Sequence, residues 1–206
     1  MKNVIFLGPP GSGKGTHATK MSRVFSIPHI STGDMLREQI KKGTKLGLEA
    51  QRYMDAGELV PDEVILGMVE QRLQEPDCAE GCIFDGFPRT EAQAEALSRI
   101  VSIYKVLNLA MPDEAIVERM KGRRVCPDCG HTSHTSWGNA EICERCGAKM
   151  VIRSDDMPDT VLARLRAYHK KTKPLIDYYQ QQNILEIVDA DAEVGVVEER
   201  VRGALT

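Results

Sequence analysis

A chain of 206 residues with 42% hydrophobic and 28% charged residues has the composition of a soluble globular protein, which excludes fibrous and disordered classes. Its formal net charge of −3 gives no bulk attraction to nucleic acid or anionic membranes, so we expect neither as a partner and expect any anion site to be local. The sequence contains no apolar run near the roughly 18 residues of a membrane span and no signal-peptide core, which predicts a cytoplasmic protein.

Short apolar runs along the chain predict the strands of one parallel sheet. They cover Asn3–Leu7 and residues 27–30, 82–84, 106–109 and 184–188. Longer amphipathic stretches separate them, and this alternation of strand and helix patterns is typical of a parallel sheet covered on both faces. The sequence therefore predicts an α/β fold.

Two stretches interrupt the alternation. Residues 31–60 contain polar helical segments with few large apolar side chains, which predicts a small helical flap over a cleft. Residues 123–156 contain four cysteines, the only Trp and many turn residues. The rest of the chain, residues 1–30, 61–122 and 157–206, is expected to form the core domain.

A glycine-rich loop follows the first predicted strand. The sequence GPPGSGKGT, residues 8–16, fits the phosphate-binding pattern G-x-x-x-x-G-K between a predicted strand and a predicted helix. Glycines let backbone N–H groups approach an anion, and the positive end of the helix dipole points to the same place. We expect Lys14 to contact the transferring phosphoryl group and Thr16 to contact phosphate or the magnesium shell. The alternative is a simple turn with an exposed lysine.

Three further motifs follow in order: STGDMLR at residues 31–37, FDGFPRT at residues 84–90 and GRRV at residues 122–125. With GPPGSGKGT they resemble the adenylate kinase family of nucleoside monophosphate kinases, nearly from end to end. The resemblance implies a P-loop three-layer fold with a five-stranded parallel sheet, an NMP-binding flap at residues 31–60 and a lid at residues 123–156. It implies reversible transfer of a phosphoryl group from Mg-ATP to AMP, which gives two ADP.

The resemblance also implies a set of site residues, among them six arginines that single patterns would leave as solvated surface cations. The residues implied in catalysis are Lys14, Asp85, Arg89, Arg123, Arg153 and Arg164. The ATP site would comprise Gly11, Ser12, Gly13, Lys14, Gly15, Thr16, Arg119, Arg123, Thr132, Ser133 and Ala192. The AMP site would comprise Thr32, Arg37, Glu58, Leu59, Val60, Gly86, Phe87, Pro88, Arg89, Gln93, Arg153 and Arg164.

Within that set, Asp85 resembles the carboxylate that organises the water shell of magnesium, with a strand-end cap as the alternative role. No general base is needed, because the acceptor phosphate oxygens are already anionic. The site must instead exclude water, and the two interrupting stretches are the candidates for mobile covers.

Two CxxC pairs, formed by Cys126 with Cys129 and Cys143 with Cys146, lie within the predicted lid. Four thiolates complete a tetrahedral metal sphere and leave no position for water, which predicts a structural zinc that stiffens a segment too small for its own core. Disulfide pairing is the alternative, and a cytoplasmic location disfavours it. Nearby His131 and His134 are expected to face the surface or the substrate.

The lid departs from the family pattern after Gly130, where HTSH stands in place of the usual aromatic residue and the segment is shorter. Past the lid, Asp155 and Asp156 could form a hinge ion pair or an exposed acidic turn. Elsewhere, Cys78 and Cys82 are expected to be small apolar fillers.

Other readings remain open from the sequence. A GTP-using or pyrimidine monophosphate kinase would share the phosphate loop and the DGFPR motif. A zinc-ribbon ATPase that binds nucleic acid would explain the basic residues around the cysteines, but not FDGFPRT. We expect a monomer, because closure around two substrates leaves little fixed surface to share.

Overall fold

The structure is a computed structural model that describes residues 3–138 and 140–206. Within these residues five strands form one parallel sheet in the order β2-β3-β1-β4-β7. The strands are β1 Asn3–Leu7, β2 His29–Ser31, β3 Ile83–Asp85, β4 Ile103–Ala110 and β7 Leu185–Asp189. The predicted α/β fold is confirmed, with the expected boundaries for β1 and boundaries one to three residues from the expected ones for the other four strands.

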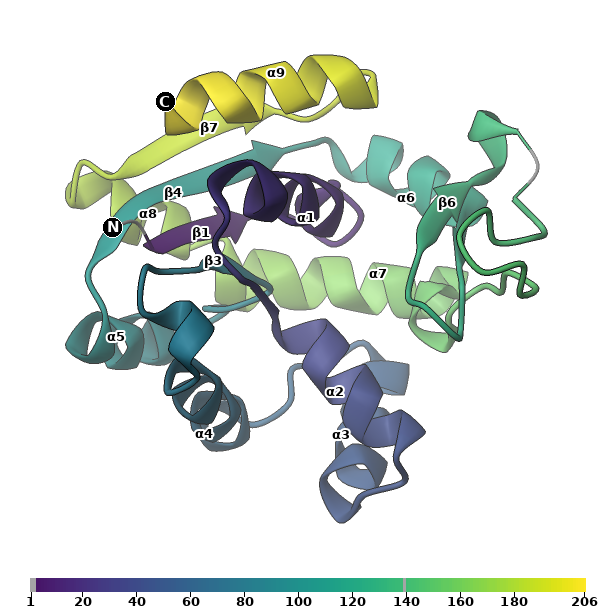
Figure 1. Cartoon of the computed structure of the whole chain (residues 1–206), viewed down its shortest axis with the longest axis horizontal. Helices are drawn as coiled ribbons and strands as arrows, with labels where there is room; N and C mark the ends of the chain where they lie inside the picture. Colours follow the sequence, from purple (N-terminus) through teal and green to yellow (C-terminus); the bar gives the residue numbers. More distant parts are fainter. Residues whose placement is uncertain (1–2, 139) are drawn as a thin grey trace.

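The sheet is buried on both faces, as the central strand β1 illustrates. Val4 and Phe6 point into one hydrophobic cluster, whereas Ile5 and Leu7 point into another on the opposite face. The first cluster is covered by α1 Lys14–Phe25, α6 Asp113–Gly122, α7 Pro158–Ala167 and α9 Val194–Leu205. The second is covered by α4 Asp62–Leu73, α5 Glu91–Ile100 and α8 Leu175–Gln181 (Figure 1).

The strand order determines where a ligand can bind. The central strand β1 lies between β3 and β4, and the loop of residues 8–13 leaves its carboxyl end to begin α1. Ligands of open α/β sheets bind outside the carboxyl ends of the strands where the strand order reverses. The fold thus places the glycine-rich loop at the expected binding edge.

The first interrupting stretch forms a helical hairpin of α2 Thr32–Lys41 and α3 Lys45–Ala56. Side-chain oxygens cap both helices, since Ser31 Oγ accepts from Asp34 N and Thr44 Oγ1 accepts from Gly47 N. The two helices touch at Gly47, where an added Cβ would lie 2.2 Å from the carbonyl oxygen of Gln39. The hairpin therefore depends on a close backbone approach.

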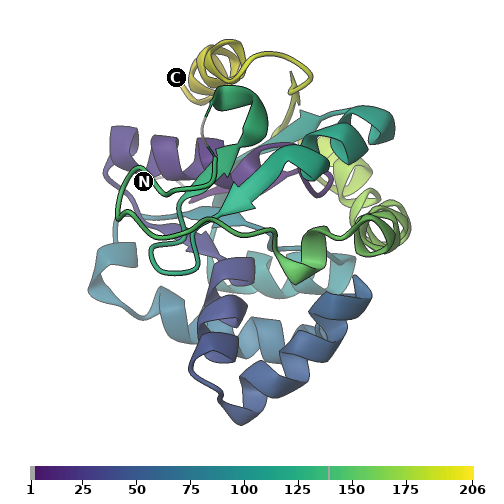
Figure 2. The ribbon, with the colours of Figure 1, turned by 90° about the vertical axis from the view of Figure 1, so that its right-hand side faces the viewer.

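The second interrupting stretch forms a separate small sheet of β5 Arg123–Val125 and β6 Thr132–His134. Short 3-10 turns follow at η2 Thr135–Trp137 and η3 Ser154–Asp156, and another, η1 Pro76–Cys78, precedes β3. Figures 1 and 2 place this segment at the end of the molecule toward which the sheet strands point. Its buried cluster contains little more than two cysteines and Met150.

The long helical stretch after the lid is interrupted. A π-helical turn, η4 Tyr168–Thr172, separates α7 from α8. Apolar residues of α7 pack in the first hydrophobic cluster and those of α8 in the second, so the chain changes faces at this turn.

Two smaller expectations concern burial. Cys78 and Cys82 are buried as predicted, but they are not purely apolar fillers. Arg72 Nη1 donates to Cys78 Sγ at 3.0 Å, and Cys82 Sγ donates to Asn3 Oδ1 at 3.4 Å. Desolvation raises the pKa of the Cys82 thiol to about 12. None of the helices in the described part of the chain has the length and hydropathy needed to cross a bilayer.

The contact at Gly47 predicts a selective effect of alanine. Gly47→Ala forces a Cβ into the backbone of Gln39 and should destabilise the protein by about 1–3 kcal/mol. Gly67→Ala, in helix α4 with open space around its added Cβ, is the matched control and should be neutral or stabilising by about 0.4–1 kcal/mol. Urea unfolding of the two variants measures both, and equal midpoints would refute the close-approach argument.

Candidate active site

The glycine-rich loop wraps closely around the end of β1. Gly8, Gly11 and Gly13 all have positive φ, and a Cβ on Gly8 would lie 2.5 Å from the carbonyl oxygen of Leu109 on β4. Only glycine fits this conformation and this contact. Lys14 begins α1, and its Nζ donates to the carbonyl oxygens of Gly8 at 2.8 Å and Pro9 at 2.7 Å. The ammonium group is thereby held at the mouth of the loop.

The surroundings of Lys14 carry excess positive charge. The pKa of Lys14 is lowered from 10.5 to about 7, mainly by desolvation; Asp85 opposes the shift, and nearby Arg89, Arg164 and Arg123 add to it. Burial and neighbouring cations destabilise the ammonium group of this lysine, and a bound phosphate anion would stabilise it. The geometry confirms that the loop, Lys14 and these arginines converge.

Asp85, at the end of β3, faces this cation. Burial raises its pKa, but hydrogen bonding from His29 and the charges of His29, Lys14 and Arg89 outweigh that effect and lower the pKa overall. His29 Nε2 lies 3.3 Å from Asp85 Oδ2, and Nδ1 of the same ring lies 3.3 Å from Thr19 Oγ1. Asp85 is therefore anchored as an anion.

The unusual Gly15 has a steric explanation. A Cβ at this position would lie 3.2 Å from Asp85 Oδ2. The serine or threonine that most phosphate loops place here would crowd the carboxylate. The hydroxyl is instead on the next residue, Thr16.

The segment after β3 contacts the start of α2. Thr32 Oγ1 donates to the carbonyl oxygen of Gly86 at 2.9 Å, and Arg89 Nε donates to the same oxygen at 2.7 Å. Desolvation and Arg164 lower the pKa of Arg89 to about 10. The two motifs STGDMLR and FDGFPRT thus meet at one carbonyl oxygen, as residues of a common site must.

The other residues expected at the AMP site differ from one another in solvent exposure. Leu59 and Val60 lie between α3 and α4, next to Glu58, which is exposed. The side chain of Phe87 packs against Phe84 in the core, so only the main chain of the Phe87–Pro88 segment can reach a ligand.

The buried carboxylates of Asp155 and Asp156 form ion pairs with arginines from separate elements. Arg123 Nε donates to Asp156 Oδ2 at 2.7 Å, and Arg164 Nη1 donates to Asp156 Oδ1 at 3.1 Å. Arg164 also lies 3.2 Å from Asp155 Oδ2, and Arg37 lies 4.0 Å from the same oxygen. The hinge ion pair is therefore present, and the alternative of an exposed acidic turn is wrong.

Arg153 completes the cluster. Its Nε is buried without a hydrogen-bond partner among the described residues, and desolvation, Arg37 and Arg123 lower its pKa to about 10. Ser12 Oγ in the phosphate loop is likewise buried and unpaired in the described residues. Buried donors of this kind fit a ligand rich in anionic oxygens.

Arg119, from α6, is placed near the end of β7. Its Nη2 donates to the carbonyl oxygens of Ala190 at 3.4 Å and Ala192 at 3.5 Å. Thr132 and Ser133 lie on β6, which pairs with β5. The next residue, His134, lies with Nε2 3.0 Å from the carbonyl oxygen of Arg119, which ties the small sheet to α6.

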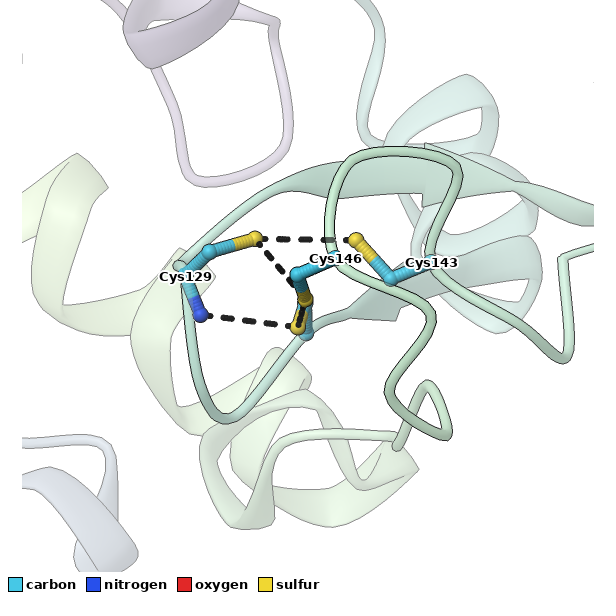
Figure 3. Close-up of side chains that lie close together, drawn as sticks. Cys129, Cys143 and Cys146 are labelled. Atoms are coloured by element: carbon cyan, nitrogen blue, oxygen red, sulfur yellow. Dashed lines mark hydrogen bonds between the residues drawn. The ribbon is translucent and has the colours of Figure 1, made fainter.

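The four lid cysteines form one cluster, and Figure 3 labels three of them, Cys129, Cys143 and Cys146. Cys126 and Cys146 have their sulfurs 3.4 Å apart, Cys129 and Cys143 3.5 Å apart, and all four sulfurs lie within 4.8 Å of one another. A disulfide requires about 2.05 Å, so the disulfide alternative is wrong. Sulfurs around a tetrahedral zinc at 2.3 Å are about 3.8 Å apart, which this cluster matches.

The nearby histidines point elsewhere. His131 Nε2 lies 2.9 Å from Glu144 Oε1, and the His134 ring contacts α6. Among the described residues, the four cysteines form the cluster of potential metal ligands here whose ligand atoms lie close enough together to hold an ion. The four cysteines are therefore compatible with an all-sulfur metal site.

Comparison with known proteins agrees with this geometry. Residues 6–184 match the family described as adenylate kinase. The chain belongs to the adenylate kinase family. It is 48% identical to the adenylate kinase of Archaeoglobus fulgidus over 98% of this chain and 97% of that protein. The adenylate kinases of Desulfitobacterium hafniense strain DCB-2 and Caldicellulosiruptor bescii are 48% and 47% identical, covering 94% and 98% of this chain and 93% and 98% of their own.

Membership in this family makes the chain a nucleoside monophosphate kinase. Adenylate kinase motifs that lie more than one hundred residues apart in the sequence, such as those of Lys14 and Arg123, thus meet at the carboxyl edge of one sheet. The zinc-ribbon ATPase reading has no support from the comparisons.

Some residues of this adenylate kinase site could not be found from the sequence. His29 contacts Asp85, and Thr172 Oγ1 in the π-helical turn donates to the carbonyl oxygen of Arg89 at 2.9 Å. Asp62 accepts a hydrogen bond from Gln93 at 2.7 Å. These residues lie outside the recognised motifs, or at their edges, and only three-dimensional contact identifies them.

Replacing the lysine of the loop tests its role. Lys14→Met should lower kcat by about 100-fold or more, because it removes a preorganised cation from the transferring group. The melting temperature should not fall, since burial opposes the charge that the variant removes. Steady-state kinetics and thermal unfolding check the two parts, and near-normal turnover would refute the assignment.

The same variant isolates a pH effect on stability. Between the folded pKa of about 7 and the ordinary value of 10.5, the unfolded chain binds a proton that the folded chain lacks. The free energy of unfolding of the wild type relative to Lys14→Met should therefore rise as pH increases through this window. A difference that stays flat between pH 7 and 10 would contradict the low pKa.

Proposed function

We propose that the protein catalyses reversible phosphoryl transfer from Mg-ATP to AMP, giving two ADP. The observation that carries the proposal is the convergence of Lys14 and several partly buried arginines at the carboxyl edge of the sheet, in a chain of the adenylate kinase family. Phosphoryl transfer asks a protein mainly to align donor and acceptor and to neutralise charge. This cluster is suited to both tasks.

The donor and acceptor would enter from opposite sides of that cluster. On the donor side, the phosphate loop would hold the ATP phosphates while Arg119, Ala192 and the strand with Thr132 and Ser133 hold the nucleoside. On the acceptor side, Arg37 and Arg89 would clamp the AMP phosphate. The residues that would contact the acceptor nucleoside are Thr32, Glu58, Leu59, Val60, Gly86, Phe87, Pro88 and Gln93.

The arginines of the lid and of α7 would then neutralise the group in transit. Arg123, Arg153 and Arg164 come from different elements but share the carboxylates of Asp155 and Asp156 or lie beside them. Those carboxylates keep the guanidinium groups together, and an anionic phosphoryl group would complete the charge balance. No base is required in this scheme.

Three units would move relative to one another during turnover: the core, the NMP-binding flap of residues 31–60 and the lid of residues 123–156. Two contacts support closure of flap and lid over the site. Lys41 Nζ donates to the carbonyl oxygen of Pro127 at 3.2 Å, and Ser154 Oγ donates to Asp55 Oδ1 at 2.8 Å. Such closure would exclude water and suppress hydrolysis of ATP.

The proposed cofactors have different roles. Magnesium bound with ATP neutralises phosphate charge, and Asp85, anchored as an anion by His29, is the residue that would orient its water ligands. Zinc would be structural, because the four cysteines fill its coordination sphere. The metal would replace the apolar core that the lid lacks.

The remaining properties follow from chemistry. Four free thiols close together persist in a reducing compartment, which favours the cytoplasm. We propose a monomer, because the flaps must move, and partners limited to ATP, AMP and ADP rather than nucleic acid. Of the basic lid residues, Arg123 is already paired with Asp156, and Arg124 donates to backbone carbonyl oxygens.

Product formation tests the proposed reaction. With Mg-ATP held constant and AMP, CMP, UMP and GMP offered in turn, chromatography should detect ADP formation that depends on AMP. The same assay with GTP as donor tests the GTP-using alternative. Transfer to pyrimidine nucleotides in place of AMP, or loss of ATP without any acceptor, would refute the proposal.

Metal analysis tests the lid. Cys143→Ser should lower the bound zinc from about one per chain and the melting temperature by about 5 °C or more, with a smaller effect on activity at low temperature. Cys78→Ala, a buried cysteine outside the cluster, is the control and should keep the metal. Unchanged zinc content in Cys143→Ser would overturn the four-cysteine assignment.

A further inference from the structure

Asp62, the first residue of α4, receives two hydrogen bonds from the start of α5. Its Oδ1 accepts from Gln93 Nε2 at 2.7 Å, and its Oδ2 accepts from Thr90 Oγ1 at 2.8 Å. Thr90 in turn caps α5, because its Oγ1 accepts from Gln93 N at 3.2 Å. The carboxylate of Asp62 therefore fixes both the capping residue and the Gln93 side chain.

The other end of the Gln93 amide is also held. Its Oε1 accepts from the backbone N–H of Arg89 at 2.7 Å. An ionised carboxylate only accepts and a backbone N–H only donates, so the amide fits between them in one orientation. Turning the amide by 180° would place its NH2 group next to the Arg89 N–H, where two donors face each other. It would also place its oxygen next to the Asp62 carboxylate, where two acceptors face each other. With Gln93 2% exposed, water cannot compensate for those losses.

We propose that Asp62 is a positioning residue that selects adenine over guanine in the acceptor site by fixing the orientation of the Gln93 amide. The inference rests on the proposed function, in which Gln93 contacts the acceptor base. Besides its hydrogen bonds to Asp62 and to the Arg89 N–H, the amide keeps one N–H and one oxygen lone pair. These can pair with the two polar groups on one edge of a base.

The two purines present those groups in opposite order. Adenine has a donor amino group at N6 beside the acceptor N1, whereas guanine has the acceptor O6 beside the donor N1–H. The fixed amide offers its oxygen to the amino group and its N–H to N1 of adenine. Pairing with guanine would require the amide to turn, which Asp62 and the Arg89 N–H both oppose. The charge of the carboxylate strengthens this opposition.

The test compares kcat/KM for AMP and GMP at saturating Mg-ATP. Asp62→Ala should reduce the AMP-to-GMP ratio by about tenfold or more, mainly through a higher KM for AMP, while KM for ATP stays unchanged. Asp62→Asn can still present an oxygen to Gln93 and an NH2 to Thr90 Oγ1, so it should restore most of the ratio.

A matched control separates this role from helix stabilisation. Glu63 is the other acidic residue in the first turn of α4 and is exposed. Glu63→Ala removes the same charge from the helix terminus and should leave the ratio unchanged. A folded Asp62→Ala protein that keeps the wild-type ratio would overturn the inference while leaving the proposed function intact. A wild-type protein that transfers nothing to AMP would refute both.

A second measurement decides the question if Asp62→Ala does not fold. In the wild-type protein, hydrogen exchange of the Gln93 side-chain amide, followed by NMR, should be much slower than that of the exposed Gln180. Equal exchange rates would show that the amide is not held, and the inference would fail without any variant.

Discussion

The concentration of positive charge at the carboxyl edge of the sheet is the constraint on which the site depends. Lys14, Arg89 and Arg153 are all held where burial lowers their pKa values. Cations withdrawn from water need anions nearby, and the chain supplies Asp85 on one side and the Asp155–Asp156 pair on the other. The charges left uncompensated are the property that makes the edge a phosphate site.

The scaffold keeps this charge cluster together through contacts that cross the fold. The π-helical turn is the clearest case, because Thr172 binds the carbonyl oxygen of Arg89 while His169 contacts Asp113 at the start of α6 at 2.8 Å. One irregular turn thus links the acceptor-side loop to the helix that leads into the lid. Local irregularity of this kind is common at functional sites.

The lid differs from the rest of the fold in what can stabilise it. Its apolar cluster is too small to fold by burial, and four sulfurs occupy its centre. The lid is joined to the core where His134 fits against Gly122, at which an added Cβ would lie 2.3 Å from the ring nitrogen. Metal binding would make the lid rigid internally, and this close contact fixes the start of the lid against α6.

The sequence by itself determined the features that depend on short patterns: the α/β class, the glycine loop around Lys14 and the paired cysteines. A strand, a tight turn or a CxxC pair is encoded by neighbours in the chain. The tertiary structure alone decided which side chains hold the site residues in place. His29 and Asp85 are 56 positions apart, and Thr172 and Arg89 are 83. No local pattern encodes such pairs, because they form only when packing of the sheet and helices brings distant segments within hydrogen-bond distance.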